Sequence, residues 1–443
     1  MTYWRRSYLS TFVFFYALSI SLFLQLVFLP LVSSLHAGDG LLLGGDYSSF
    51  HRAAVFMAER LDSLGFFASF TFHPDGQGPV SILALHYWVT GIYKPWVFLP
   101  FNAFLFSVSV TALHFVLSQV VTKKIAVMCI IPMVFLPSSI MIFGQIHKDV
   151  FSLAGLCLIF YLWAFINELI DISWRSFIIV LVISFSSGFL FWLVRPYLLK
   201  IFILSFFSYF LFLMFLSVLK FKGFRLRFND FICFFVLIIS FISWDFLPVN
   251  SNKGLSSFAN YVSFDDGYFD SLENNGFDSS IAGEVLLKIN KTRNGFLNYK
   301  DAGSNIDTDI NFTSWLELIS YIPRSLQIGF FSPFPSMWFS EGRSPGGDLM
   351  RVISAFEMMY FYFSLFGLFL VIWLCDRGKK VLVCSLIICG MIIFIYSLVI
   401  TNVGTLYRMR IGALHIMSSF GLCGWYYFYK LKVYRCFYTR NGS

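Results

Sequence analysis

Charged side chains are scarce in this sequence. Asp, Glu, Lys and Arg together make up 13% of its 443 residues, whereas hydrophobic residues make up 58%. Soluble globular domains carry about 25% charged residues, so this composition excludes an ordinary soluble domain. It predicts an integral membrane protein instead.

Cysteine is absent from the segments where an extracellular fold would need it. None of the eight cysteines lies in the two long polar segments, residues 33–96 and 249–351, and no CxxC pair occurs. Secreted domains use cysteines as disulfide pairs, and structural zinc sites use closely spaced ones. The sequence therefore indicates neither a disulfide-bonded ectodomain nor a zinc site.

The formal net charge of +8 does not indicate a surface that binds nucleic acid. Lys and Arg cluster in short segments between hydrophobic runs, as the positive-inside rule describes for cytoplasmic loops. These basic clusters predict the orientation of the chain in the membrane and contact with anionic lipid.

A membrane-spanning helix needs about 20 apolar residues. By that criterion the sequence predicts ten spans, at residues 9–32, 97–121, 125–145, 151–170, 176–194, 197–219, 229–248, 352–374, 381–400 and 411–429. A further apolar run at 79–93 is too short to cross, so we expect it to be re-entrant or interfacial. If it did span, Lys123, Lys124 and the basic stretch 220–227 would face outward.

The predicted fold is therefore an all-α integral membrane protein with about ten transmembrane helices and both termini in the cytoplasm. Residues 1–248 form an N-terminal module of seven spans, 249–351 a large outer loop, and 352–443 a C-terminal module of three spans. The first outer loop, 33–96, contains apolar residues at helical spacing over 48–67. This spacing predicts an amphipathic helix at the membrane interface.

Ionisable residues on the predicted outer side are the candidates for function. Short outer loops should be poor in Lys and Arg, yet they contain five such residues: Lys148, Arg195, Lys200, Arg408 and Arg410. Two acids stand on short turns of the same side, Asp46 after Gly44–Gly45 and Asp149 after His147–Lys148.

The residue types indicate the chemistry. Carboxylates act as general bases on hydroxyl groups or bind metal ions, whereas Arg and Lys suit phosphate. The predicted ligand is amphiphilic, with an anionic head at the membrane surface, and the predicted reaction transfers a group from a lipid-linked phosphate to a hydroxyl. Nothing in the sequence requires a cofactor; a divalent metal would fall to Asp46 and Asp149.

Four further residues accompany these candidates, and each also has a purely structural interpretation. Arg52 follows Asp46 closely enough to contact a substrate phosphate, or it anchors the helix at the interface. His51 and His147 are candidates for support of the acids, or are ordinary loop histidines. Glu357, inside the eighth predicted span, belongs to the same outer site or is a paired structural acid.

The order of these features resembles the GT-C superfamily of polytopic glycosyltransferases. The stretch "GGDYSSFHRAA" resembles the acid-bearing start of the first outer loop in that superfamily, with Asp46 at the acid position. Residues 73–93 resemble the short segment that closes this loop, and "LPSSIMIFGQIHKD" at 136–149 resembles its second motif. The second motif contains a single Asp after Lys rather than a DxD or DxE pattern, and no large C-terminal soluble domain follows.

The resemblance implies a bacterial inner-membrane enzyme that uses a polyprenyl-phosphate-linked sugar in the assembly of envelope polysaccharide or glycolipid. Asp46 would deprotonate the acceptor hydroxyl, the anomeric configuration would invert, and Arg408, Arg410 or Arg195 would stabilise the departing phosphate.

Two other functions remain open from the sequence. An O-antigen-type polymerase or ligase would use a lipid-diphosphate-linked glycan and rely on Arg in the large outer loops, here Arg324 and Arg343. A flippase or transporter of the same lipid would be expected to show internal repeats and broken helices at the midplane. No repeat is evident, and the unusual charges lie at the predicted outer surface.

Overall fold

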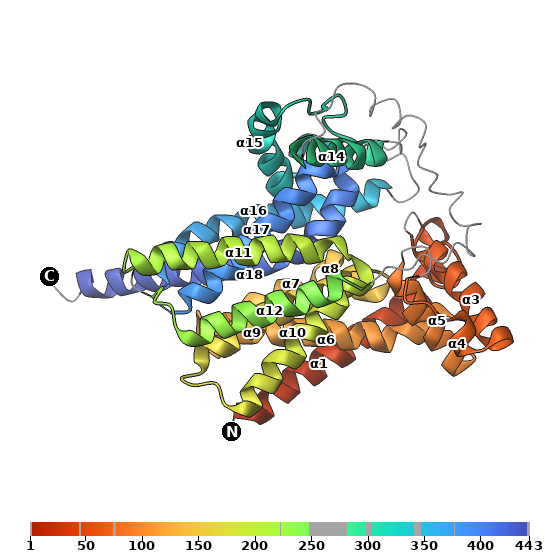
Figure 1. The fold of residues 1–443 in the computed structure, drawn as a ribbon, viewed down its shortest axis with the longest axis horizontal. Helices are drawn as coiled ribbons and strands as arrows, with labels where there is room; N and C mark the ends of the chain where they lie inside the picture. The colour runs from red at the N-terminus through yellow and green to blue at the C-terminus, as the bar shows by residue number, and fades with distance from the viewer. Residues whose placement is uncertain are drawn as a thin grey trace. The chain divides into compact units, whose positions relative to one another are not determined.

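The computed structural model describes residues 2–43, 46–73, 77–221, 223–247, 281–297, 304–340, 347–375 and 377–440, and its regular structure over these residues is helical (Figure 1). Eight helices are long and apolar enough to cross a membrane, or nine if a bent pair counts as one span. The predicted class, an all-α polytopic membrane protein, is confirmed.

The helices, in chain order, are α1 (Thr2–Phe23), continued by a π-helical turn and α2 (Leu29–Leu31), α3 (Tyr47–Leu64), α4 (Phe66–Ser69), α5 (Gly78–Thr90), α6 (Leu99–Leu117), α7 (Lys123–Phe135), α8 (Pro137–Gly144), α9 (Asp149–Glu168), α10 (Trp174–Val194), α11 (Tyr197–Val218), α12 (Phe228–Asp245), α14 (Ile281–Leu297), α15 (Trp315–Phe331), α16 (Gly347–Leu374), α17 (Lys379–Val399) and α18 (Val403–Arg440).

Two predicted spans differ in detail from the helices observed. Residues 125–145 form α7 and α8, which meet at an angle of 69°. Leu136 has an extended conformation before Pro137, as expected, because proline disfavours a helical residue before it. Residues 411–429 lie within the 38-residue helix α18, which is not among the eight candidate spans. The short run 79–93 forms α5, a helix of 13 residues.

The chain divides into two compact units by its packing. The first unit contains Met1–Asn252, Tyr360–Cys389 and Gly412–Ser443, and the second contains Lys253–Met359 and Gly390–Ile411. The predicted module boundaries at residues 248 and 351 were placed where a hydrophobic run ends and the next one begins. The division by packing instead joins the end of α17 and the start of α18 to α14 and α15 in the second unit.

In the first unit, α9 packs closely against α6 and α10. Gly155 of α9 makes the approach of α10 possible, since a Cβ atom there would lie 2.7 Å from the ring of Phe191. The Ser187 hydroxyl donates to the Gly155 carbonyl over 2.9 Å at the same crossing. The central position of α9 matters because Asp149 stands at its first residue.

The first outer loop contains the predicted amphipathic helix. Helix α3 buries Phe50, Ala54, Met57, Ala58 and Leu61, and it packs against α5. The predicted helix is therefore confirmed, and most of its apolar face is covered by protein, whereas Leu64 at its end is exposed. Its position at the membrane interface stays a prediction.

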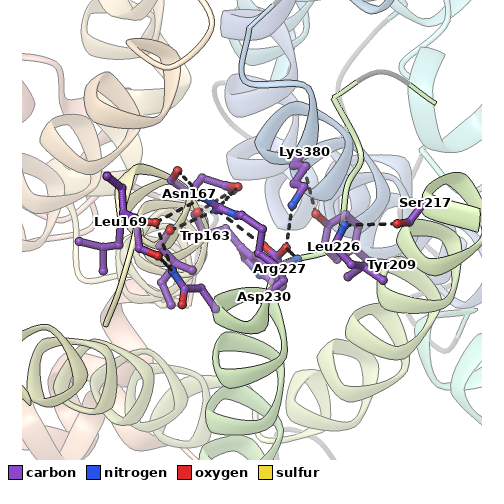
Figure 2. A network of polar contacts seen from close by, with 12 residues as sticks. Trp163, Asn167, Leu169, Tyr209, Ser217, Leu226, Arg227, Asp230 and Lys380 are labelled. Atoms are coloured by element: carbon purple, nitrogen blue, oxygen red, sulfur yellow. Dashed lines mark hydrogen bonds and ion pairs between the residues drawn. The ribbon is translucent and has the colours of Figure 1, made fainter. Parts of the chain in front are cut away.

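A polar network joins the end of α9 to the starts of α12 and α17, at what we call the Asp230 end of the first unit (Figure 2). Arg227 donates to the carbonyl oxygens of Ile166, Asn167 and Leu169 at the C-terminal end of α9. Asp230 is fully buried and accepts from Lys380 Nζ over 2.6 Å. Arg227 thus supplies hydrogen-bond donors to a helix end, and Lys380 provides a counter-charge for a buried acid.

We expect Lys380→Met to lower the free energy of unfolding by about 2–4 kcal/mol, because it leaves the buried Asp230 carboxylate with only the more distant guanidinium of Arg227, 4.0 Å away. The double variant Asp230→Leu/Lys380→Met should recover part of this loss, since an apolar pair needs no charge compensation, but not all of it, since Asp230 also accepts from the Arg227 amide at the start of α12. Denaturant unfolding of the purified protein in detergent measures both. The neighbouring Lys379→Met is the control, with an expected change within about 0.5 kcal/mol. Wild-type stability in Lys380→Met would show that the pair contributes nothing.

Candidate functional site

The first turn of α3 lies on the junction between α8 and α9. The ring of Tyr47 is 5.6 Å from that of His147, and Lys148 Nζ stands 5.5 Å from the centre of the Phe50 ring. Tyr47 and Phe50 are both buried by these contacts and their neighbours. The structure therefore brings together the two segments that the sequence singled out, 46–52 and 147–149. We call this region the junction site.

Asp149 is the buried centre of the junction site. It is 5% exposed, and Arg195, which follows the last residue of α10, donates to its Oδ1. His147 Nδ1 lies 2.7 Å from its Oδ2. A buried carboxylate needs such a cation to remain charged, so Arg195 and Asp149 stabilise each other, and Arg195 is itself only 6% exposed.

Asp46 occupies a different environment. It is the residue before the first turn of α3, its carbonyl oxygen accepts from the Phe50 amide over 2.9 Å, and its side chain is exposed. Gly44 and Gly45 lie outside the described residues. The two acids predicted as a pair therefore differ, because one is accessible to a substrate and the other is buried with a guanidinium.

A second polar group, the first-loop cluster of Asp39, His51, Tyr87 and Lys94, fixes α3 to α5 and to the preceding turn. His51 Nδ1 lies 2.8 Å from the Tyr87 hydroxyl and its Nε2 lies 3.6 Å from Asp39. Lys94 Nζ donates to Asp39 Oδ1 over 2.6 Å. Arg52 is exposed on the adjacent position of α3.

Sequence reasoning did not find Asp39, Tyr87 or Lys94. The available signal was the Gly-Asp-Gly turn at 38–40, since Asp39 has a positive φ of 52°, a conformation that asparagine and aspartate adopt more readily than other non-glycine residues. Lys94 and Tyr87 stand out only once α5 is seen against α3.

Lys200 lies on α11 in the first unit, with its Nζ 3.9 Å from the Asp245 carboxylate; the other predicted residues belong to the second unit. Arg410 is fully buried and donates to the carbonyl oxygens of Ile328, Gly329 and Ser332 at the end of α15. Glu357 of α16 is 2% exposed and accepts from the Tyr407 hydroxyl of α18. Arg408 is partly exposed near the start of α18. Arg410 therefore caps a helix end within its own unit.

The described part of the chain contains no group of three or more His, Cys, Asp or Glu side chains arranged to hold a metal ion. The junction site offers an exposed carboxylate, Asp46, and cationic side chains. No protein-family model, curated protein or solved structure matches this chain, so its function has to be argued from this arrangement.

Low pH is expected to weaken the packing of α3 against α5. Burial is the main cause that lowers the pKa of His51 below its ordinary value of 6.5, with an opposing contribution from Asp39. The unfolded chain therefore binds a proton at a higher pH than the folded one, so this contribution to stability is present above about pH 6.5 and is lost as the pH falls toward the folded pKa. Amide exchange in residues 47–64 should be faster at pH 5.5 than at pH 7.5, after correction for intrinsic rates.

His51→Gln is the matched control, because glutamine keeps a polar partner for Tyr87 and does not titrate. Its α3 peptides should show no such change between the two pH values. Equal protection of wild-type α3 at both pH values would contradict the role given to His51.

Proposed function

We propose that this protein is a membrane glycosyltransferase of the GT-C type, which transfers a sugar from a polyprenyl-phosphate-linked donor to a hydroxyl acceptor. The observation that supports this most is the contact between the first turn of α3 and the α8–α9 junction, through Tyr47–His147 and Phe50–Lys148. Because Asp46 directly precedes Tyr47 and its side chain is exposed, this contact supports a catalytic carboxylate close to the charged residues at the start of α9, a candidate span.

In the proposed reaction Asp46 takes the proton of the acceptor hydroxyl. The hydroxyl oxygen then bonds to the anomeric carbon from the face opposite the phosphate, and the bond between that carbon and the phosphate oxygen breaks. The electron pair leaves with the lipid phosphate, and the anomeric configuration inverts. General base assistance contributes about 10²–10⁴-fold to such a reaction.

The cations of the site take separate roles in this proposal. Lys148 is partly exposed and Arg52 is exposed, so these two are the proposed contacts to the lipid phosphate on the first unit. Arg195 is buried against Asp149, so Asp149 is proposed to position Arg195, together with His147, which lies 2.7 Å from its other oxygen. The role that the sequence predicted for Arg408, a residue of the second unit, stays a prediction, whereas the guanidinium of Arg410 is engaged by three carbonyl groups.

The proposed location is the bacterial cytoplasmic membrane, with the junction site on its outer face and both termini in the cytoplasm. Basic residues gather at the opposite end of the first unit, where Gln119 contacts Glu168 and Lys380 contacts Asp230. Lys123 begins α7 and Lys379 begins α17 at this end. The positive-inside rule supports a cytoplasmic assignment for it.

The polymerase or ligase alternative has less support from the described residues. Its proposed arginine, Arg324, donates from Nε and from a terminal nitrogen to the Asp307 carboxylate, over 3.0 and 3.1 Å. The other terminal nitrogen of Arg324 donates to the side-chain oxygen of Gln327 over 2.8 Å. Arg343 lies outside the described residues.

Asp46→Asn is expected to lower the transfer rate at least 100-fold while the protein remains folded in the membrane, because the amide cannot accept the proton of the acceptor. The assay uses purified protein in nanodiscs with candidate polyprenyl-phosphate sugars and measures release of the lipid phosphate. Asp62→Asn is the matched control, since Asp62 is an exposed acid of the same helix that accepts from Tyr93.

The contrary outcome is full activity in Asp46→Asn, which would remove Asp46 from the mechanism. If Arg324→Met abolished turnover of a lipid-diphosphate glycan while Asp46→Asn did not, the polymerase or ligase assignment would replace the one proposed.

A further inference from the structure

Large apolar side chains are exposed between α3 and α5, although most of the apolar face of α3 is covered. Phe67 is fully exposed, Leu64 is 57% exposed and Phe72 is 44% exposed. The segment is held in place, since the Ser69 hydroxyl of α4 donates to the Arg60 carbonyl of α3 over 3.0 Å. A fixed apolar surface of this kind is unfavourable in water and indicates a contact surface.

The rings of this segment form a continuous series with two membrane helices. Phe66 stacks on Phe70 at 4.7 Å, and Phe70 meets Phe72 at 5.1 Å. Phe72 lies 5.6 Å from Trp192, which in turn lies 5.3 Å from Trp244.

Trp192 and Trp244 are in the last turns of α10 and α12, and both helices are candidate spans. Tryptophan and other aromatic side chains concentrate at the level of the lipid headgroups, where membrane helices end. The segment from Phe66 to Phe72 thus continues an aromatic layer that the two span ends begin.

We propose that residues 66–72, the aromatic segment, insert into the headgroup region of the bilayer and form the lipid contact of the first outer loop. The partner is a phospholipid surface, and the contact is apolar and aromatic rather than ionic. Most of the apolar face of α3 does not supply this contact, because Phe50, Ala54, Met57, Ala58 and Leu61 are buried within the protein; Leu64, the last residue of α3, is exposed and adjoins the segment. This inference does not depend on the enzymatic function proposed for the junction site.

A nitroxide at position 67 tests the proposal in the full-length protein. Phe67→Cys is labelled in phosphatidylcholine–phosphatidylglycerol nanodiscs, in a background with Cys436→Ser; the other seven cysteines are buried. Collision rates with molecular oxygen, which partitions into lipid, and with an aqueous nickel chelate are measured by electron paramagnetic resonance. Glu59→Cys, at an exposed position of α3, is the matched control.

We expect the label at position 67 to collide more with oxygen than with the nickel chelate, and the label at position 59 to show the reverse. The oxygen-to-nickel ratio at position 67 should exceed the ratio at position 59 several-fold. Equal ratios at the two positions would overturn the proposal and show that Phe67 faces water. Because Phe67 is fully exposed, its replacement removes little packing within the protein.

Discussion

A charge that is removed from water must have a counter-charge, and this constraint organises the junction site. Asp149 begins α9, and Arg195 follows the end of α10, so their ion pair ties the entry of one membrane helix to the exit of the next. His147 and Lys148 immediately precede Asp149, and through them α3 contacts the same place. The compensation of Asp149 thus adds a polar contact to segments that apolar packing also joins.

The same constraint acts at the opposite end of the first unit with different chemistry. There Arg227 donates to carbonyl groups at the end of α9, and Lys380 pairs with Asp230. α9 is therefore held by polar contacts at both of its ends and by apolar packing along its length. Such a helix gives a rigid base for a site built on short turns, which otherwise follow the motions of their loops.

Hydrophobic length and periodicity were sufficient to predict the helical class, most of the spans and the amphipathic helix α3. They missed the bend at Pro137, although proline is a local signal, because the hydrophobicity of 125–145 continues without a break across it. They also identified the apolar face of α3 without its partner. Periodicity shows which side of a helix is buried, but only packing shows whether α5 or lipid covers it.

Candidate residues were found because they departed from the positive-inside rule, and this signal has a clear limit. It singled out Arg195, and Asp149 was noticed separately as an acid on a short turn, but their pairing across 46 residues depends on how α9 and α10 cross. The same rule also selected Arg410 as a candidate site residue, although that side chain caps α15. Asp39 and Lys94 were not noticed, since an ion pair within one loop breaks no rule of composition.

The pairing of Asp149 with Arg195 also has a consequence for the order in which the chain can be assembled. Synthesis proceeds from the N-terminus, so the acid is made 46 residues before the arginine with which it forms its buried ion pair. The shortest segment that contains both partners is the hairpin from Asp149 to Arg195. Insertion of α9 and α10 together, as one unit, therefore allows Asp149 to be buried with its guanidinium already present.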